Sequence, residues 1–115
     1  MLKQQTALEL LKKITVENLY EKLILQINKD FQLSNLNESF AITITPNELK
    51  VGLGHLLKKM MTHHYDDYLN FVYRVDVSEK ELLAIQSDNL DEIIDQITYL
   101  ILKREYQKVW FKNKL

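Results

Sequence analysis

The chain has 115 residues, of which 46% are hydrophobic and 27% are charged, a composition typical of a globular domain and not of a disordered or fibrous protein. A formal net charge of -1 excludes a molecule whose whole surface would attract nucleic acid or anionic lipid. Cysteine is absent, which excludes disulfides, thiol catalysis and cysteine-ligated metal sites and agrees with a cytoplasmic location. We expect a single domain over residues 1–115.

No membrane segment or linker is predicted. Residues 1–5 lack the long apolar stretch of a secretion signal, and the uncharged apolar run over residues 97–102 is too short to span a bilayer. Two glycines and one proline leave no linker composition, and no internal repeat is present. These features predict a soluble protein.

The first third of the chain has helical patterning. Apolar residues recur every three or four positions from Thr6 to Lys13, which predicts a short first helix. Thr15 is the expected N-cap of a longer second helix. The apolar face of that helix would carry Val16, Leu19, Tyr20, Leu23, Ile24, Ile27 and Phe31.

A turn over residues 34–39 precedes a segment with strand periodicity. Phe40, Ile42 and Ile44 alternate with smaller or polar residues. No second alternating run exists, so a strand here would lack a partner within the chain. The segment is therefore either an extended connector with these three side chains in the core or a strand that pairs with another chain.

A third helix is predicted to begin at the sequence Thr45-Pro46-Asn47-Glu48. Thr45 can cap it, Pro46 suits the first helical position, and Glu48 can complete a capping box. Gly52 and Gly54 lie within the helix and would permit a close helix crossing. The residues expected on its apolar face are Leu49, Leu53, Leu56, Leu57, Met60 and His64.

The second half of the chain predicts three more helical segments. Asp66 or Asp67 would cap the first, and Ser78 with Glu81 would form a capping box for a short second one. The last helix would start near Asp88 or Asn89 and run to about Lys112, with acids early and bases late, as the helix dipole favours. The fold class expected is all-α, an irregular single-domain bundle of about five or six helices with one short extended segment near residues 40–45.

The last helix has two apolar faces. One contains Leu90, Ile93, Ile94, Ile97, Leu100 and Ile101 and is the expected core face. The roughly opposite face is rich in aromatic residues, which are enriched at protein interfaces. We therefore predict a protein interface formed by Tyr99, Leu102, Tyr106, Val109 and Trp110. The alternative is that the helix is central in the bundle and both faces belong to the core.

Arg104 lies on the core face of this helix. A buried guanidinium needs a carboxylate partner to offset its desolvation, and Asp76 is the candidate. A buried ion pair between Asp76 and Arg104 is thus one hypothesis. The other is that Arg104 lies at the edge of the core and extends into water.

No catalytic, cofactor or metal motif is recognisable. His63 and Asp67 could share a helix face, but His55 and His64 would lie on opposite sides, so we expect no metal site, exposed His55 and His63, and a half-buried His64. The serines occupy turn or cap positions, and Gly52-Leu53-Gly54 lacks the third glycine of a dinucleotide-binding loop. We expect no cofactor and no enzymatic activity. A polar pocket around His64, Tyr68 and Asp76 would favour a small-molecule enzyme instead.

The C-terminal segment is locally basic. Residues 103–114 carry five lysines or arginines against a single acid, Glu105, together with Tyr106, Trp110 and Phe111. Such a combination can bind phosphates and stack on bases, although cations also stabilise the C-terminus of a helix. Nucleic acid is therefore an alternative partner, and a membrane is not expected.

Two segments resemble those of small uncharacterised helical proteins of bacteria. They are residues 70–79, NFVYRVDVSE, and residues 101–108, ILKREYQK. The resemblance implies a bacterial cytosolic source and transfers no functional residue. The function we expect is a non-catalytic protein-interaction or assembly module, possibly a homodimer formed through the C-terminal helix.

Overall fold

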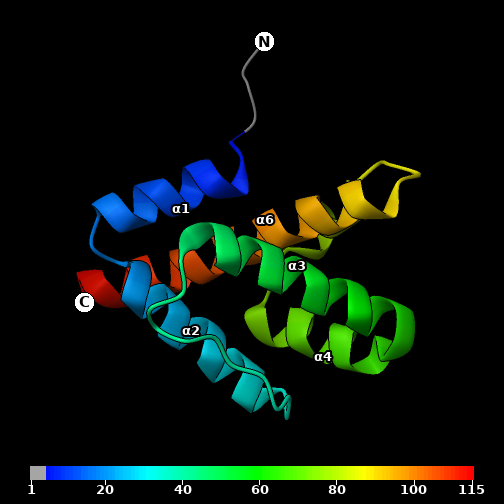
Figure 1. Cartoon of the computed structure of the whole chain (residues 1–115), viewed down its shortest axis with the longest axis horizontal. Helices are drawn as coiled ribbons and strands as arrows, with labels where there is room; N and C mark the ends of the chain where they lie inside the picture. Colours follow the sequence, from blue (N-terminus) through cyan, green and yellow to red (C-terminus); the bar gives the residue numbers. More distant parts are fainter. Residues whose placement is uncertain (1–4) are drawn as a thin grey trace.

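Six helices make up the regular structure of residues 5–115, which the computed structural model describes (Figure 1). They are α1 (Ala7–Val16), α2 (Tyr20–Leu33), α3 (Pro46–His63), α4 (Tyr65–Val75), α5 (Glu79–Leu83) and α6 (Leu90–Lys114). No strand occurs within these residues. The expected all-α bundle is confirmed.

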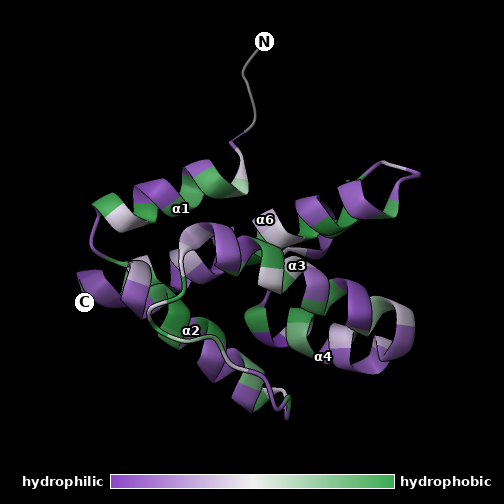
Figure 2. Ribbon diagram, in the orientation of Figure 1, coloured by the Kyte–Doolittle hydropathy of each residue, from purple (hydrophilic) through white to green (hydrophobic). Residues whose placement is uncertain are grey.

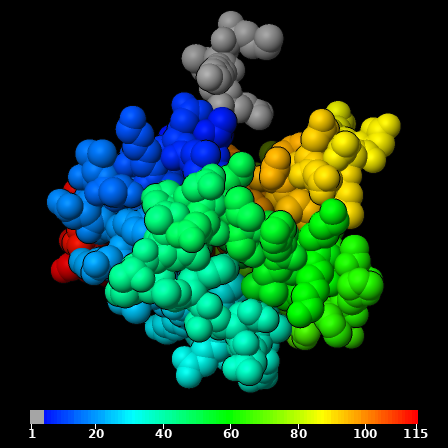
Figure 3. Space-filling view, viewed as in Figure 1, coloured from blue at the N-terminus to red at the C-terminus, as the bar shows by residue number. Residues whose placement is uncertain are grey.

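Helix α6 is the centre of the bundle. Each of the other five helices packs against it. Its 25 residues would extend about 37 Å, close to the longest dimension of the molecule, 41 Å. On the face drawn in Figure 3 the other helices lie in front of most of α6, and its two ends are visible at opposite margins. Because five helices pack against it, α6 needs more than one apolar side.

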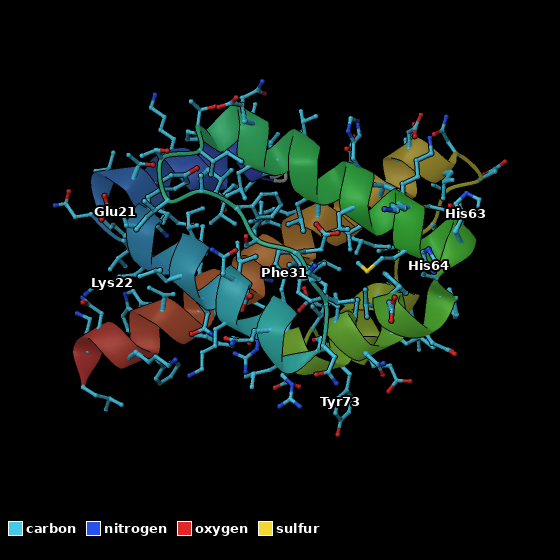
Figure 4. The ribbon with its side chains drawn as sticks, turned by 60° about the horizontal axis from the view of Figure 1, so that its bottom comes forward. Glu21, Lys22, Phe31, His63, His64 and Tyr73 are labelled. Atoms are coloured by element: carbon cyan, nitrogen blue, oxygen red, sulfur yellow. The ribbon has the colours of Figure 1, made fainter. Side chains whose placement is uncertain are left out.

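The core is built from the amphipathic faces of the helices. Each long helix in Figure 2 carries both hydrophobic and hydrophilic residues along its length. Phe31 of α2 is fully buried and stacks on Phe71 of α4, with 4.7 Å between the ring centroids (Figure 4). Apolar side chains from α1, α2, α3, α4 and α6 form a single cluster.

Several helix starts lie where the sequence predicts them. Thr45 and Glu48 form a complete capping box on α3, and Asn89 caps α6. Ser78 caps α5 by accepting a hydrogen bond from the Glu81 amide, but the Glu81 carboxylate pairs with Lys103 at 3.1 Å. The second predicted capping box is therefore only half formed.

Two predicted caps are wrong. Thr15 lies inside α1, where its hydroxyl donates to the Leu11 carbonyl at 2.8 Å, and the chain turns at Asn18, which has a left-handed φ of 59°. Since α1 continues past Thr15, Val16 is exposed and not part of the apolar face of α2. Asp66 and Asp67 lie in the first turn of α4, because His64 bends the chain and the helix begins at Tyr65.

Residues 40–45 form a connector that the side chains of α2 hold in place. The Asn28 side chain accepts from the Phe40 amide at 2.8 Å and donates to its carbonyl at 2.9 Å, and the Tyr20 hydroxyl donates to the Ile44 carbonyl at 2.6 Å. These bonds replace the ladder that a partner strand would supply. Phe40 and Ile44 pack on the core, but Ile42 is 42% exposed, so two of the three expected side chains are inward.

The two glycines of α3 face different neighbours. A Cβ atom at Gly52 would lie 3.0 Å from the Phe40 ring, whereas one at Gly54 would lie 3.6 Å from Ile94 of α6. We expected both glycines to permit a close helix crossing, but only Gly54 faces another helix. Gly52 makes room for the connector.

Candidate functional site

Two of the five predicted interface residues belong to the core. Leu102 is fully buried and Val109 is 4% exposed. The interface prediction is wrong for this pair, because α1 and α2 both pack against α6 and cover that side of it. The middle of the second apolar face of α6 therefore also belongs to the core.

Tyr99 and Tyr106 are tied to the N-terminal part of the chain. The Tyr106 hydroxyl donates to the Glu17 carboxylate at 2.7 Å, and Lys13 lies 5.5 Å from the centroid of its ring. Partial burial and the neighbouring Glu17 carboxylate raise the pKa of Tyr106 to about 12. The Tyr99 hydroxyl lies 3.3 Å from the Gln5 side-chain oxygen. Both tyrosines thus help to hold α1 on α6.

Trp110 is the exposed member of the predicted set. It is 40% exposed, and the ring of Phe111, itself 64% exposed, meets it edge-on at 5.7 Å between centroids. Lys114 lies 5.2 Å from the centroid of the Trp110 ring, within range of a cation–π contact. The last two turns of α6 therefore present an exposed aromatic pair with an adjacent ammonium group.

A groove lies between α2 and α6, and neither Trp110 nor Phe111 lines it. Its volume is about 410 Å³, and we call it the lysine groove. Leu25 and Val109 provide its apolar surface, and Leu25 is 56% exposed. The groove is lined by Lys22, Leu25, Gln26, Lys29, Val109, Lys112 and Asn113.

The three groove lysines form no ion pair within residues 5–115. Lys22 donates to the Asn113 side chain at 2.8 Å, and Lys112 donates to the Gln26 side chain at 2.8 Å. By contrast, carboxylates pair with Lys58, Lys103, Arg104 and Lys108. The charges of the groove lysines are therefore not neutralised by neighbouring carboxylates, which favours an anionic ligand.

A buried charged cluster continues from the groove into the core. Gln26 donates to the Asp30 carboxylate at 3.3 Å, and Asp30, only 2% exposed, accepts a short hydrogen bond from Lys108. Lys108 also donates to the Val75 carbonyl at 3.2 Å. Glu105 is fully buried, with one oxygen 2.8 Å from the Lys108 ammonium. The cluster thus holds two carboxyl groups and a single ammonium group.

Glu105 is poorly compensated. The Lys108 contact has a salt-bridge distance but not the direction of a hydrogen bond, so neither Glu105 oxygen has a hydrogen-bond partner among residues 5–115. Burial, followed by the neighbouring Asp30, raises the pKa of Glu105 to about 8, although Lys108 acts in the opposite direction. Glu105 therefore retains its proton at neutral pH, and the cluster is then close to neutral.

The Asp76–Arg104 pair forms, but it is not buried. The Arg104 guanidinium donates to the Asp76 carboxylate and to its backbone carbonyl, each at 3.1 Å. The Asp76 side chain is 76% exposed, since this residue ends α4 in a left-handed conformation at the surface. The hypothesis of a buried pair is wrong in that respect, because α6 reaches the edge of the core at Arg104.

Catalytic and metal-binding groups do not converge. His64 and Asp76 flank the two ends of α4, an 11-residue helix about 16 Å long, so a pocket cannot bring them together with Tyr68. All three histidines are exposed, His64 included, and residues 5–115 contain no group of three or more His, Asp or Glu side chains that could hold a metal ion. A larger hollow of 660 Å³ between α1, α5 and α6 is lined by both acids and bases.

Comparison of the chain with protein families, with curated proteins and with solved structures finds no match. Within the part of the chain described, none of the helices combines the length and the apolar character needed to cross a membrane.

The spacing of apolar residues around Glu105 indicates that its side chain is buried, but our sequence-based predictions did not include this. Glu105 lies four residues after Ile101 and four before Val109, and both of these are buried. An acid at that spacing predicts a buried carboxyl group. The partner residues Asp30 and Lys108 carry no comparable signal, because they meet only through the packing of α2 on α6.

Proposed function

We propose that this chain is a non-catalytic protein-interaction module whose lysine groove docks an acidic, partly apolar protein segment. The observation that carries the proposal is the combination, in one groove, of three lysines without carboxylate partners and an exposed leucine. Exposed apolar surface next to uncompensated charge is typical of a docking site. The cysteine-free sequence favours a module that works in the cytoplasm.

The stability of the helices does not explain all the groove lysines. Lys112 lies near the C-terminus of α6, where a cation is favourable. Lys22, however, lies in the first turn of α2, where the helix dipole disfavours a positive charge. Lys29 has no ion pair within the described residues that would account for it. Lys22 and Lys112 also join α2 to α6 through their hydrogen bonds to Asn113 and Gln26, and a role in binding is a further reason for the three lysines.

Single-stranded nucleic acid is the second candidate ligand. Phosphates would fit the lysines, and Trp110 and Phe111 offer exposed rings for stacking. A protein partner is preferred because Leu25, which is 56% exposed, gives the groove aliphatic surface, which has no counterpart on a phosphate backbone. No observation favours enzymatic activity.

Trp110, the sole tryptophan of the chain, provides the test. Its fluorescence is followed while an amphipathic peptide of about four helical turns, built from glutamate and leucine, is added. We expect saturable binding that Lys22→Glu/Lys29→Glu weakens by about tenfold or more. The control is Lys59→Glu/Lys80→Glu, which makes the same change in charge at two exposed positions outside the groove and should bind like the wild type.

Two results would overturn the proposal. Equal binding by the groove and control variants would mean that the peptide binds elsewhere. Saturable binding of oligothymidylate without binding of the peptide would favour the nucleic-acid function instead, and that binding should weaken steeply with added salt.

A further inference from the structure

The outward face of α4 has an apolar surface that the fold does not use. Tyr65, Leu69 and Tyr73 follow one another at four-residue spacing and are 55%, 46% and 84% exposed. We call these three residues, together with Asp66, which lies on the same side of the helix, the α4 strip. Folding leaves about half or more of each of these large side chains in water, so an intermolecular contact is a reason for their presence.

The α4 strip is acidic at its N-terminal end. Asp66 lies in the first turn of α4 and forms no ion pair within residues 5–115. The strip is thus an acidic helix with exposed apolar side chains. This is the chemistry that the lysine groove fits, with uncompensated lysines around an apolar surface.

The acidic end of the strip and the start of the groove lie on different sides of the molecule. Figure 4 shows Lys22, at the start of α2, on one side, His64, which immediately precedes the α4 strip, on the other, and Tyr73, the last residue of the strip, between them. The acidic end of the strip therefore lies away from Lys22 of its own chain. Two copies can bring them together, and each joint leaves one groove and one strip free for further copies.

We propose that a second copy of this chain is a partner of the lysine groove, with its α4 strip docked between α2 and α6, so that the chain assembles head to tail. The proposal rests on the docking function proposed above. Asp66 of one copy would approach Lys22, Lys29 and Lys112 of the next, while Leu69 and Tyr73 would cover Leu25. A strip of three helical turns buries less than the roughly 1,000 Å² of a stable interface, so the association is weak and sensitive to salt.

The test is a mixing experiment with two variants. Lys22→Glu/Lys29→Glu disables the groove, and Asp66→Lys/Leu69→Lys disables the strip; circular dichroism verifies that each is folded. The molar mass is measured by light scattering over micromolar to millimolar concentrations. The molar mass of the wild type should rise with concentration beyond that of a dimer, and added sodium chloride should reverse this rise. Each variant alone should stay monomeric, and their mixture should form a 1:1 dimer that grows no further, because each retains one working surface.

A wild type that stays monomeric at millimolar concentration would overturn the head-to-tail proposal. So would a mixture of the two variants that stays monomeric, or a wild type that stops at a dimer, since a closed two-fold dimer uses the same surface twice. The peptide titration separates this failure from that of the docking function. Peptide binding by a monomeric wild type would remove only the second copy as partner, whereas its absence would remove both proposals.

Discussion

The charged cluster at Glu105, Lys108 and Asp30 contains one more acid than base, and little of it reaches water. Charges in such a place are stable only when they are paired, so the surplus carboxyl group keeps a proton. The proton is expected on Glu105, which is fully buried, because Asp30 accepts hydrogen bonds from both Gln26 and Lys108. A short network thus links the groove, through Gln26, to a titratable group in the core.

The stability of the fold should fall as the pH rises from about 4.5 to about 8. Glu105 holds its proton up to pH 8 in the folded chain but releases it near 4.5 when unfolded, so the folded state binds more protons in this window. The contribution is therefore fully present below about pH 4.5 and is lost as the pH approaches 8, with a size on the order of a few kcal/mol. Urea unfolding at a series of pH values measures it.

Glu105→Gln should remove this pH dependence, because glutamine is neutral throughout the window. Glu21→Gln, at an exposed position of α2, is the matched control and should keep the wild-type profile. A profile that is unchanged in Glu105→Gln would contradict the assignment of the proton to Glu105.

Removal of the single cation of the cluster should lower the free energy of unfolding substantially. Lys108→Met leaves Asp30 without its ammonium partner and places two acids together, for which about 3–5 kcal/mol of destabilisation is expected at neutral pH. Lys59→Met, on the exposed face of α3, should change the free energy of unfolding by less than about 0.5 kcal/mol. Similar losses for the two variants in urea unfolding would show that the cluster is not a stabilising contact.

At the scale of the helices, the two glycines of α3 should respond differently to alanine. Gly54→Ala should stabilise the fold by up to about 1 kcal/mol, since the new Cβ would meet Ile94 at an ordinary contact distance and alanine favours a helix. Gly52→Ala should lose this gain, because its Cβ would lie 3.0 Å from the Phe40 ring and force it to move. Thermal unfolding of both variants gives the comparison, and equal stabilisation would mean that the connector yields freely.

The C-terminal turns of α6 have a packed side and an exposed side, and substitutions on the two sides should differ in their effect on the free energy of unfolding. Tyr106→Glu would place a second carboxylate beside Glu17 in a half-buried contact, so we expect a loss of about 2–3 kcal/mol in the free energy of unfolding. Trp110→Glu should change the free energy of unfolding by less than about 0.5 kcal/mol, because the ring is 40% exposed, and urea unfolding followed by circular dichroism measures the change. Unfolding of Trp110→Glu would instead assign Trp110 to the core.

For the whole molecule, the sequence by itself determined what depends on neighbours along the chain. The start of α3 at Pro46 and of α6 after Asn89 follow from capping residues that bond to amides three positions away. The all-α class follows from three-to-four periodicity. The end of α1 was misplaced because Asn18, and not Thr15, reverses the chain, and a left-handed residue has only a weak local signature.

Only the tertiary structure decided which side of each helix is covered. Leu102, Val109 and Trp110 lie on one apolar face of α6, and the sequence does not distinguish them; α1 and α2 bury the first two and leave the third exposed. The lysine groove and the buried cluster arise in the same way, because residues some 80 positions apart meet only when α2 packs on α6. Periodicity fixes the direction of a side chain relative to its own helix, but burial and charge pairing depend on the neighbours that long-range packing supplies.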